Sequence, residues 1–351
     1  MFRYYSRTWG DNMNIKDIAR LSGVGVSTVS RVLNNHSDVK DSTREKVKKV
    51  IRESNYVPNN SARILKQNNT NNIGVLVMGV FNPLFSEMTN IIGNIINGSK
   101  YTMIFEQNDY TKEDDFDTLQ SLIKEKRLQG VICLGGNFNS ERRMTLKALG
   151  IPIVLTSVNT IVDEDKDGYS SVGVDNEKSA YTATRYLIDL GHKDIAIMIG
   201  QKKDTGISNL RLNGYKKALI EAGINIDEGN ILEGNYSTRL AYEVMRKFLC
   251  SGKKISAVFA ISDFMAIGIA KAVVDSGLEI GKDISIIGFD GMDVSEFYNP
   301  GITTISQPKI EIATKSANVL LELINNRNSK NKHIVLETKL IKRQSCKKNL
   351  L

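Results

Sequence analysis

The chain has 351 residues, more than one domain of the usual size of about 100–200 residues, so its length predicts two or three folding units. Hydrophobic residues make up 41% and charged residues 25%, a balance typical of folded globular proteins, which excludes a disordered chain. No stretch of about 20 apolar residues is present, and residues 1–12 lack the apolar centre of a signal peptide. These patterns exclude a membrane-spanning or exported protein.

Basic residues are concentrated at the N-terminal end of the chain. Residues 1–67 contain 13 Lys and Arg against 6 Asp and Glu, whereas the rest of the chain contains 34 against 33. A basic head on a nearly neutral body indicates a polyanionic partner for the head alone. The alternative is an ordinary solvated surface, but its basic residues would not be concentrated in one part of the chain.

Cysteine usage indicates the compartment. Cys133, Cys250 and Cys346 lie far apart and form no paired motif, as in proteins of a reducing compartment. Cys133 lies in an apolar run, where a buried free thiol is expected. We therefore expect a cytoplasmic protein. Its start is either Met1 or Met13, because residues 1–12 share none of the patterns that follow.

Three short helices are expected in the basic region. Apolar spacing predicts helices over residues 16–21 and 26–33, separated by a break at Gly23. Residues 42–45, Ser-Thr-Arg-Glu, match a capping box that would open a third helix ending near Asn55. A helix, a glycine turn and a second helix are typical of a helix-turn-helix, whose second helix enters the major groove of DNA.

The second helix of such a unit presents base-reading side chains near its N-terminus. Val26, Ser27 and Arg31 are predicted to face the bases, and Thr28 and Ser30 to hold phosphates. Arg31 is the best candidate for bidentate bonding to guanine, which contributes roughly 1–3 kcal/mol of discrimination. The alternative is an ordinary helical hairpin with Arg31 on a solvated face.

After a polar linker at residues 68–72, strand-like and helix-like segments alternate. Apolar strand-like runs occur at residues 73–77, 102–105, 131–134, 153–155, 195–199, 257–261 and 284–287. Amphipathic, helix-length segments occur at residues 176–190, 211–222 and 263–276. Apolar strands with helical crossovers predict α/β lobes built on two doubly wound parallel sheets, with a ligand cleft between them. The basic and polar segment 330–351 is expected to trail off.

The core lacks the motifs of common enzymes. No GxxxxGK[ST] phosphate loop and no GxSxG nucleophile elbow is present. Gly23 and Gly25 lie within a helical hairpin and not between a strand and a crossover helix, which excludes a dinucleotide-binding loop. Asp290 and Asp293 have the wrong spacing for a paired-aspartate phosphoryl-transfer site. Three isolated histidines form no zinc-like cluster. We therefore expect no catalysis, no cofactor and no metal, and a transport binding protein would have no use for the headpiece.

Several ordered motifs resemble the lactose/galactose repressor (LacI/GalR) family of bacterial transcription regulators. The headpiece reads NIKDIARLSGVGVSTVSRVLN at residues 14–34, TREKV at 43–47 and NYVPN at 55–59. Further landmarks in the core are IGV at 73–75, LGHKDIA at 190–196, RLNGY at 211–215, DFMAIG at 263–268, IIGFD at 286–290 and TTISQP at 303–308. The resemblance implies a helix-turn-helix headpiece and a periplasmic-binding-protein-like core of two lobes. It implies a ligand-responsive repressor that binds a palindromic operator as a homodimer.

The resemblance also implies which residues contact DNA. They are Lys16, Val26, Ser27, Thr28, Ser30, Arg31, Asn34, Tyr56, Asn59, Ala62, Leu65 and Lys66. Residues 61–66 would form a hinge helix that folds on DNA, with Leu65 wedged between base pairs of the minor groove and Lys66 lining it. An inert linker is the alternative. One departure is Gly25, where many members have a serine that contacts phosphate; glycine can still precede a helix.

The resemblance also implies which residues bind the effector. The matching residues are Phe85, Arg211, Tyr236, Ser262 and Asp290, although Phe85 and Tyr236 can equally be core residues. The implied ligand is a sugar or sugar phosphate, and a nucleobase or a phosphocarrier partner protein is the alternative. We expect Asp263 to orient the start of its own helix by capping, and His192 to pack or cap beneath the sheet.

The implied division of the chain has five parts. They are an unassigned extension (1–12), the headpiece (13–58), the hinge helix and linker (59–72), the effector-binding and dimerisation core (73–343) and a basic tail (344–351). Within the core, one lobe comprises 73–175 with about 309–336, and the other comprises 176–305 with about 337–343.

Overall fold

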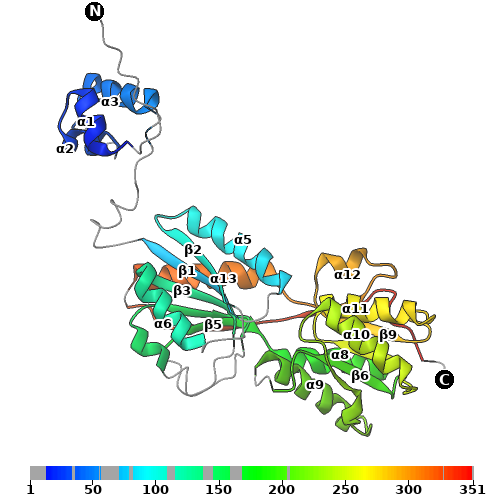
Figure 1. Ribbon diagram of the computed structural model, residues 1–351. Coiled ribbons are helices and arrows are strands. Elements are labelled where there is room, and N and C mark those ends of the chain that lie inside the picture. The colour runs from blue at the N-terminus through cyan, green and yellow to red at the C-terminus, as the bar shows by residue number, and fades with distance from the viewer. Residues whose placement is uncertain are drawn as a thin grey trace, which may run out of the picture. The chain divides into compact units, whose positions relative to one another are not determined.

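The protein forms two compact units, Met1–Thr70 and Asn71–Leu351 (Figure 1). The computed structural model describes residues 13–33, 36–54, 56, 71–78, 82–108, 115–136, 145–158, 168–203, 206–326 and 328–349. The first unit contains the helical headpiece, and the second contains the α/β core.

The headpiece consists of three helices, as expected. They are α1 (Ile15–Ser22), α2 (Val26–Leu33) and α3 (Asp41–Glu53). Ile18, Val29 and Val47, one from each helix, are completely buried and form the centre of the small core. Gly23 ends α1 in the left-handed conformation at φ 62°, which glycine adopts without strain.

The expected capping box at residues 42–45 is wrong. Helix α3 begins at Asp41, so Ser42 already lies inside its first turn. A capping box exists instead at α1, where the Asn14 side chain accepts from the N–H of Asp17 and the Asp17 carboxylate accepts from the N–H of Asn14. The correct signature is therefore Asn-x-x-Asp, with the shorter acid in place of Glu.

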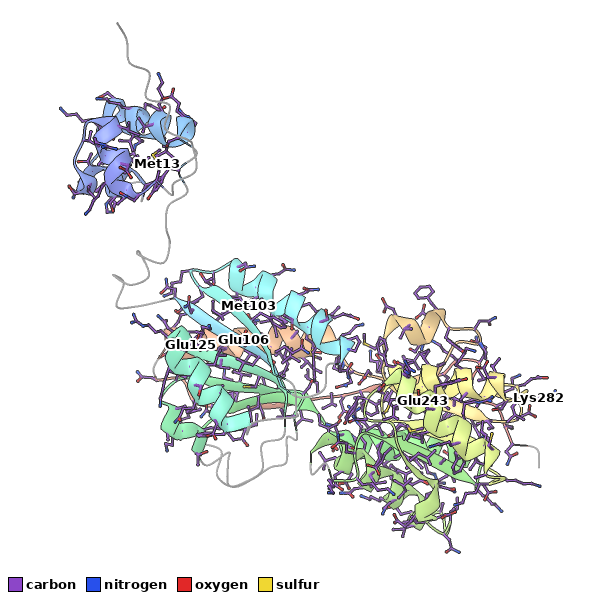
Figure 2. The ribbon with its side chains drawn as sticks, in the orientation of Figure 1. Met13, Met103, Glu106, Glu125, Glu243 and Lys282 are labelled. Atoms are coloured by element: carbon purple, nitrogen blue, oxygen red, sulfur yellow. The ribbon has the colours of Figure 1, made fainter. Side chains whose placement is uncertain are left out.

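The first lobe is a parallel six-stranded sheet in the order β11-β5-β4-β3-β1-β2. Its strands are β1 (Asn72–Met78), β2 (Thr102–Asn108), β3 (Leu128–Gly135), β4 (Ile153–Thr156), β5 (Ser170–Val174) and β11 (His333–Leu336). In the register, Val75 lies opposite both Phe105 and Ile132. Helices α5 (Pro83–Asn97) and α13 (Lys309–Asn325) pack on one face of the sheet and α6 (Asp115–Lys126) on the other. Beneath α5, Met103 of β2 lies close to Gly93 (Figure 2).

The second lobe repeats this plan in the order β12-β10-β9-β8-β6-β7. Its strands are β6 (Ile195–Ile199), β7 (Ile231–Glu233), β8 (Ala257–Ala260), β9 (Ser285–Asp290), β10 (Thr303–Ser306) and β12 (Lys339–Ile341). Only β12 runs antiparallel to its neighbour among these described strands. The covering helices are α8 (Asn176–Asp189), α9 (Ile207–Glu221), α10 (Thr238–Cys250), α11 (Asp263–Asp275) and α12 (Asp293–Phe297).

The chain passes between the lobes after β5, after β10 and after β11, so each lobe is built from separate stretches of sequence. Strands β6, β8 and β9 are buried along their whole length, because helices cover both faces of the sheet. The fold class predicted from the alternation of strands and helices is confirmed. Among the described residues, no helix is both long and apolar enough to cross a bilayer.

Residues 330–349 are packed against the core, contrary to expectation. Within segment 330–351, β11 and β12 each extend one sheet, and the following Ser345 is completely buried. Its hydroxyl donates to the carbonyl of Ile286 at 2.6 Å and accepts from the N–H of Thr303 at 2.8 Å. Ser345 can be buried here because its hydroxyl satisfies backbone groups of β9 and β10.

His192 packs beneath the second sheet, as expected. Its Nδ1 lies 2.9 Å from the Ser256 hydroxyl and its Nε2 lies 3.1 Å from the carbonyl oxygen of Lys347. Burial lowers the pKa of His192. The ring of His192 therefore links the C-terminal segment at Lys347 to Ser256 of the second lobe.

Replacing Ser345 by Ala is expected to lower the free energy of unfolding by about 1–3 kcal/mol, because the buried N–H of Thr303 loses its acceptor. Urea unfolding followed by circular dichroism measures the change. Lys348→Ala, at an exposed position on the same segment, is the control. Equal midpoints for wild type and Ser345→Ala would show that this segment adds nothing to the stability of the core.

Candidate functional site

The exposed face of α2 carries the predicted base-reading residues. Val29 and Val32 turn inward and are at most 2% exposed, which fixes the rotation of the helix against α1 and α3. Val26, Ser27 and Arg31 are consequently exposed. Thr28 and Ser30 are half-buried, and Lys16 of α1 is exposed. The helix thus offers one polar and accessible face, as a recognition helix requires.

Two residues that were expected to contact DNA lie in surroundings that differ from the expectation. Tyr56 is only 9% exposed and packs in the core of the headpiece, which favours a packing role for its ring. Arg31 lies in the last turn of α2 rather than near its N-terminus, and its Nη2 makes an ion pair with Asp38 Oδ2 at 3.0 Å. Asn34, Asn59, Ala62, Leu65, Lys66 and the hinge helix 61–66 lie outside the described residues.

Replacing Gly25 by Ser is expected to tighten DNA binding roughly fivefold, the effect of about one added hydrogen bond to phosphate. Gly25 precedes α2, and its carbonyl accepts the N–H groups of Thr28 and Val29. A Cβ at residue 25 would lie 3.6 Å from Ser27 Oγ and 3.9 Å from Thr28 Oγ1, which are ordinary contacts. Fluorescence anisotropy on a duplex measures the affinity.

The control for this substitution is Gly98→Ser in the core unit, where a Cβ also meets ordinary contacts of 3.5 Å. It is expected to leave DNA affinity unchanged. Unchanged affinity for Gly25→Ser as well would mean that residue 25 lies away from the phosphates.

In the core, Asp290 lies where a ligand is expected, at the carboxyl end of β9. Its side chain is fully buried, and its backbone is held at φ 114°, a conformation that is strained for a residue other than glycine. Asn82 Nδ2 donates to Oδ2 at 3.2 Å, and Gln307 Nε2 donates to Oδ1 at 2.8 Å. Burial raises the pKa of Asp290, and the nearby Arg211 opposes this effect.

Arg211 is the cationic partner at this site. It is 4% exposed on α9, and its Nη1 lies 3.8 Å from Asp290 Oδ1. Nε donates to Asn176 Oδ1 at 3.0 Å, and Nη1 also donates to the carbonyl of Ile261. The guanidinium carbon stacks 3.5 Å from the centre of the Phe289 ring. A guanidinium with these partners has a fixed orientation and can present donors to a ligand.

The site includes groups from both lobes. Asn82 caps the N-terminus of α5 in the first lobe, where its Oδ1 accepts the N–H of Leu84, and it reaches Asp290 of the second lobe. Phe85 follows in the first turn of α5 and is 7% exposed. Gln307 lies in the connection between β10 and α13, which leads back to the first lobe. A ligand that binds Asp290 therefore affects the contacts between the lobes.

Tyr236 and Ser262 follow β7 and β8, at the same carboxyl edge of the second sheet as Asp290. The ring of Tyr236 lies against the backbone of Gly200, where a Cβ would come within 2.4 Å of Tyr236 Cε2. Ser262 is 2% exposed and caps α11, its Oγ accepting the N–H of Met265 at 3.3 Å. The structure thus joins Arg211 and Asp290 directly, whereas Tyr236 and Ser262 share their sheet edge.

The expectation that Asp263 caps its own helix is wrong. Ser262 is the N-cap of α11, and the carboxylate of Asp263 bonds away from the helix. Its Oδ2 accepts the N–H of Met292 and its Oδ1 accepts the hydroxyl of Thr304, both at 2.7 Å. Asp263 therefore supports the turn that follows Asp290.

Sequence reasoning missed Asn82 and Gln307. The signal for Asn82 was present, since Asn before Pro at the start of a helix is a capping pattern. Gln307 is recognisable only from its contact with Asp290. Within the described part of the chain, no group of three or more His, Cys, Asp or Glu side chains is arranged to hold a metal ion.

Comparison with known proteins agrees with both units. The family described as bacterial regulatory proteins, lacI family, matches residues 14–59, and the periplasmic binding protein-like domain matches residues 184–346. The HTH-type transcriptional regulator MalR of Clostridium butyricum is 59% identical over 334 residues, which are 95% of this chain and 99% of that protein.

Two solved structures extend the likeness to the whole fold. The Lac repressor dimer bound to operator and the anti-inducer ONPF has a TM-score of 0.77 at 25% identity, covering 96% of this chain and 100% of that one. The transcriptional regulator CelR in complex with cellobiose has a TM-score of 0.70 at 28% identity, with coverage of 95% and 99%. The family match of the headpiece and the 59% identity to MalR show that the chain belongs to the LacI family of bacterial transcription regulators.

Proposed function

We propose that this regulator is a repressor that binds a palindromic operator as a homodimer and is controlled by a sugar or sugar phosphate. Family membership makes the chain a cytoplasmic DNA-binding regulator and not an enzyme. The observation that carries the proposal is the buried Arg211–Asp290 pair, which is bonded to the first lobe through Asn82. A site of this kind couples ligand binding to the arrangement of the lobes.

The chemistry of the site favours a hydroxylated ligand. Asp290 supplies acceptors, Arg211 supplies donors, and Asn82 and Gln307 have amide groups that can do both. Phe85 and Tyr236 would supply apolar ring faces for a sugar. A structural relative supports this choice, since CelR is in complex with cellobiose.

The proposed switch is a change in the lobes. Asn82 of the first lobe donates to Asp290 of the second, so a ligand that binds Asp290 would replace or extend this contact. The ligand shifts DNA affinity only by the amount that it prefers one lobe arrangement to the other. The hinge residues 61–66 are too few to form a stable helix alone, so small movements of the core can decide whether they fold on DNA. Two-fold symmetry of a dimer would require a palindromic site.

The test is binding of the purified protein to fragments of its own gene neighbourhood at two salt concentrations. A panel of sugars, sugar phosphates and nucleobases is added in turn, with a phosphocarrier protein as a further arm. We expect tight, salt-sensitive binding to one palindrome, released by one sugar or sugar phosphate. Release by a nucleobase or response to the phosphocarrier would replace the sugar proposal, and absence of specific binding to every fragment would contradict the repressor proposal.

A further inference from the structure

Arg31 and Asp38 form an ion pair on the face of the headpiece that carries the exposed residues of α2. Arg31 Nη2 lies 3.0 Å from Asp38 Oδ2, and the two side chains are 57% and 51% exposed. The pair is thus accessible to DNA. It also places a carboxylate beside the arginine that is expected to read guanine.

The loop that carries Asp38 is held by hydrogen bonds at its start. The N–H of His36 donates to the carbonyl of Arg31 at 3.0 Å, and Arg44 of α3 donates through Nη2 to the carbonyl of His36 at 2.6 Å. These contacts connect the end of α2, the loop and α3. Asp38 therefore has a defined position relative to Arg31, which a mobile side chain on a free loop would not have.

We propose that Asp38 lowers the affinity of the headpiece for DNA, because its carboxylate holds Arg31 and releases it only to a bidentate acceptor such as guanine. The inference rests on the proposed function, in which α2 reads the operator. On a matching base pair, Arg31 exchanges Asp38 for the O6 and N7 atoms of guanine. On other DNA, the ion pair persists and Arg31 contributes no charge to phosphate binding.

The relative strengths of the two interactions permit this exchange. An exposed ion pair is weak, a factor of at most about five in an equilibrium constant. A bidentate contact to guanine discriminates by a factor of roughly 5 to 150. A single phosphate contact offers Arg31 no such advantage over a carboxylate 3.0 Å away. Asp38 therefore weakens binding to all DNA, because the ion pair must be broken on a matching site and Arg31 is withheld from phosphate on other DNA.

Asp38→Asn is expected to bind a 30-bp duplex of scrambled sequence about three- to tenfold more tightly at low salt, since one cation is freed and one anion removed. The slope of log K against log salt should become steeper by about 0.9, the value for one additional phosphate contact. Selection from a randomised duplex pool should give the wild-type consensus, because guanine remains the partner that Arg31 prefers.

Two controls separate this effect from net charge and from folding. Glu53→Gln removes one negative charge at the end of α3, where Glu53 pairs with Lys49 at 3.8 Å, and should change neither the slope nor the affinity by a comparable amount. In an Arg31→Ala background, Asp38→Asn should have little further effect, because Asp38 acts through Arg31. Circular dichroism checks that each variant is folded.

The outcomes distinguish the inference from the proposed function. Equal effects of Asp38→Asn and Glu53→Gln, or a full effect of Asp38→Asn without Arg31, would overturn the role of Asp38. An unchanged slope and an unchanged affinity of Asp38→Asn for scrambled DNA would do the same. If the wild-type protein selects no palindromic consensus at all, the proposed function itself fails.

Discussion

Replacing Arg211 by Ala is expected to abolish effector binding and to lower the free energy of unfolding of the core by about 3–5 kcal/mol. The buried carboxylate of Asp290 would lose its one cationic partner within ion-pair distance among the described residues. It would retain only the neutral donors Asn82 and Gln307, which cannot balance a buried charge. Isothermal titration with the sugar that releases the operator and urea unfolding measure the two effects.

A double variant separates binding from stability. Arg211→Met with Asp290→Asn removes both buried charges, so it is expected to recover part of the lost stability while still failing to bind the effector. Arg246→Ala, which removes a half-buried arginine that donates to the carbonyl of Asp275, is the control for loss of a guanidinium elsewhere in the same lobe. Normal sugar affinity in Arg211→Ala would contradict the location of the effector site.

Arg211→Lys tests the shape of the group as well as its charge. The guanidinium bonds Asn176 and the carbonyl of Ile261 while lying flat on the Phe289 ring. A lysine keeps the charge but cannot form this planar set of contacts. We expect Arg211→Lys to be more stable than Arg211→Ala and still to bind sugar weakly.

Local regularities made the headpiece and most of the core predictable. The apolar spacing in residues 26–33 follows the helical period because Val29 and Val32 must face a small core, and the observed α2 has the same bounds. Strands such as β6 and β9 are visible as apolar runs because both of their faces are covered. In these elements, the apolar residues that form the sequence pattern are the same residues that are buried in the structure.

The remaining features depend on contacts between distant residues. The edge strands β11 and β12 are only partly buried, and their apolar runs at residues 334–336 and 340–341 are short and flanked by polar residues. The burial of Ser345 depends on Ile286 and Thr303, which are far away in the chain. The roles of Gln307 and Asp263 likewise arise from partners on other strands, which hydrophobic periodicity cannot reveal.

Replacing Asp263 by Asn is expected to make the core more stable relative to wild type at pH 7.5 than at pH 4.5. Burial raises the pKa of Asp263 to about 7, and the neighbouring carboxylate of Asp290 acts in the same direction. The ordinary value is 3.8, so the folded state binds this proton more tightly than the unfolded state does. Between about pH 4 and pH 7, the folded wild-type protein therefore loses stability as the pH rises.

Asparagine is the suitable replacement because it can keep both contacts without an ionisable group. Its amide oxygen can accept the N–H of Met292, and its amide nitrogen can donate to Thr304 Oγ once that hydroxyl proton turns away. Urea midpoints of the two proteins at several pH values give the difference directly. His192, whose lowered pKa makes wild type lose stability as the pH falls below about 6.5, is present in both proteins and cancels.

The expected difference between Asp263→Asn and wild type grows through the window from about pH 4 to pH 7 and is constant above it. Asp293→Asn, at an exposed carboxylate in the adjacent α12, should show no such growth, because its side chain is 84% exposed to solvent. A difference that stays the same at every pH would mean that Asp263 remains ionised throughout. The donors Met292, Thr304 and Ser295, which favour the charged form, would then outweigh its burial.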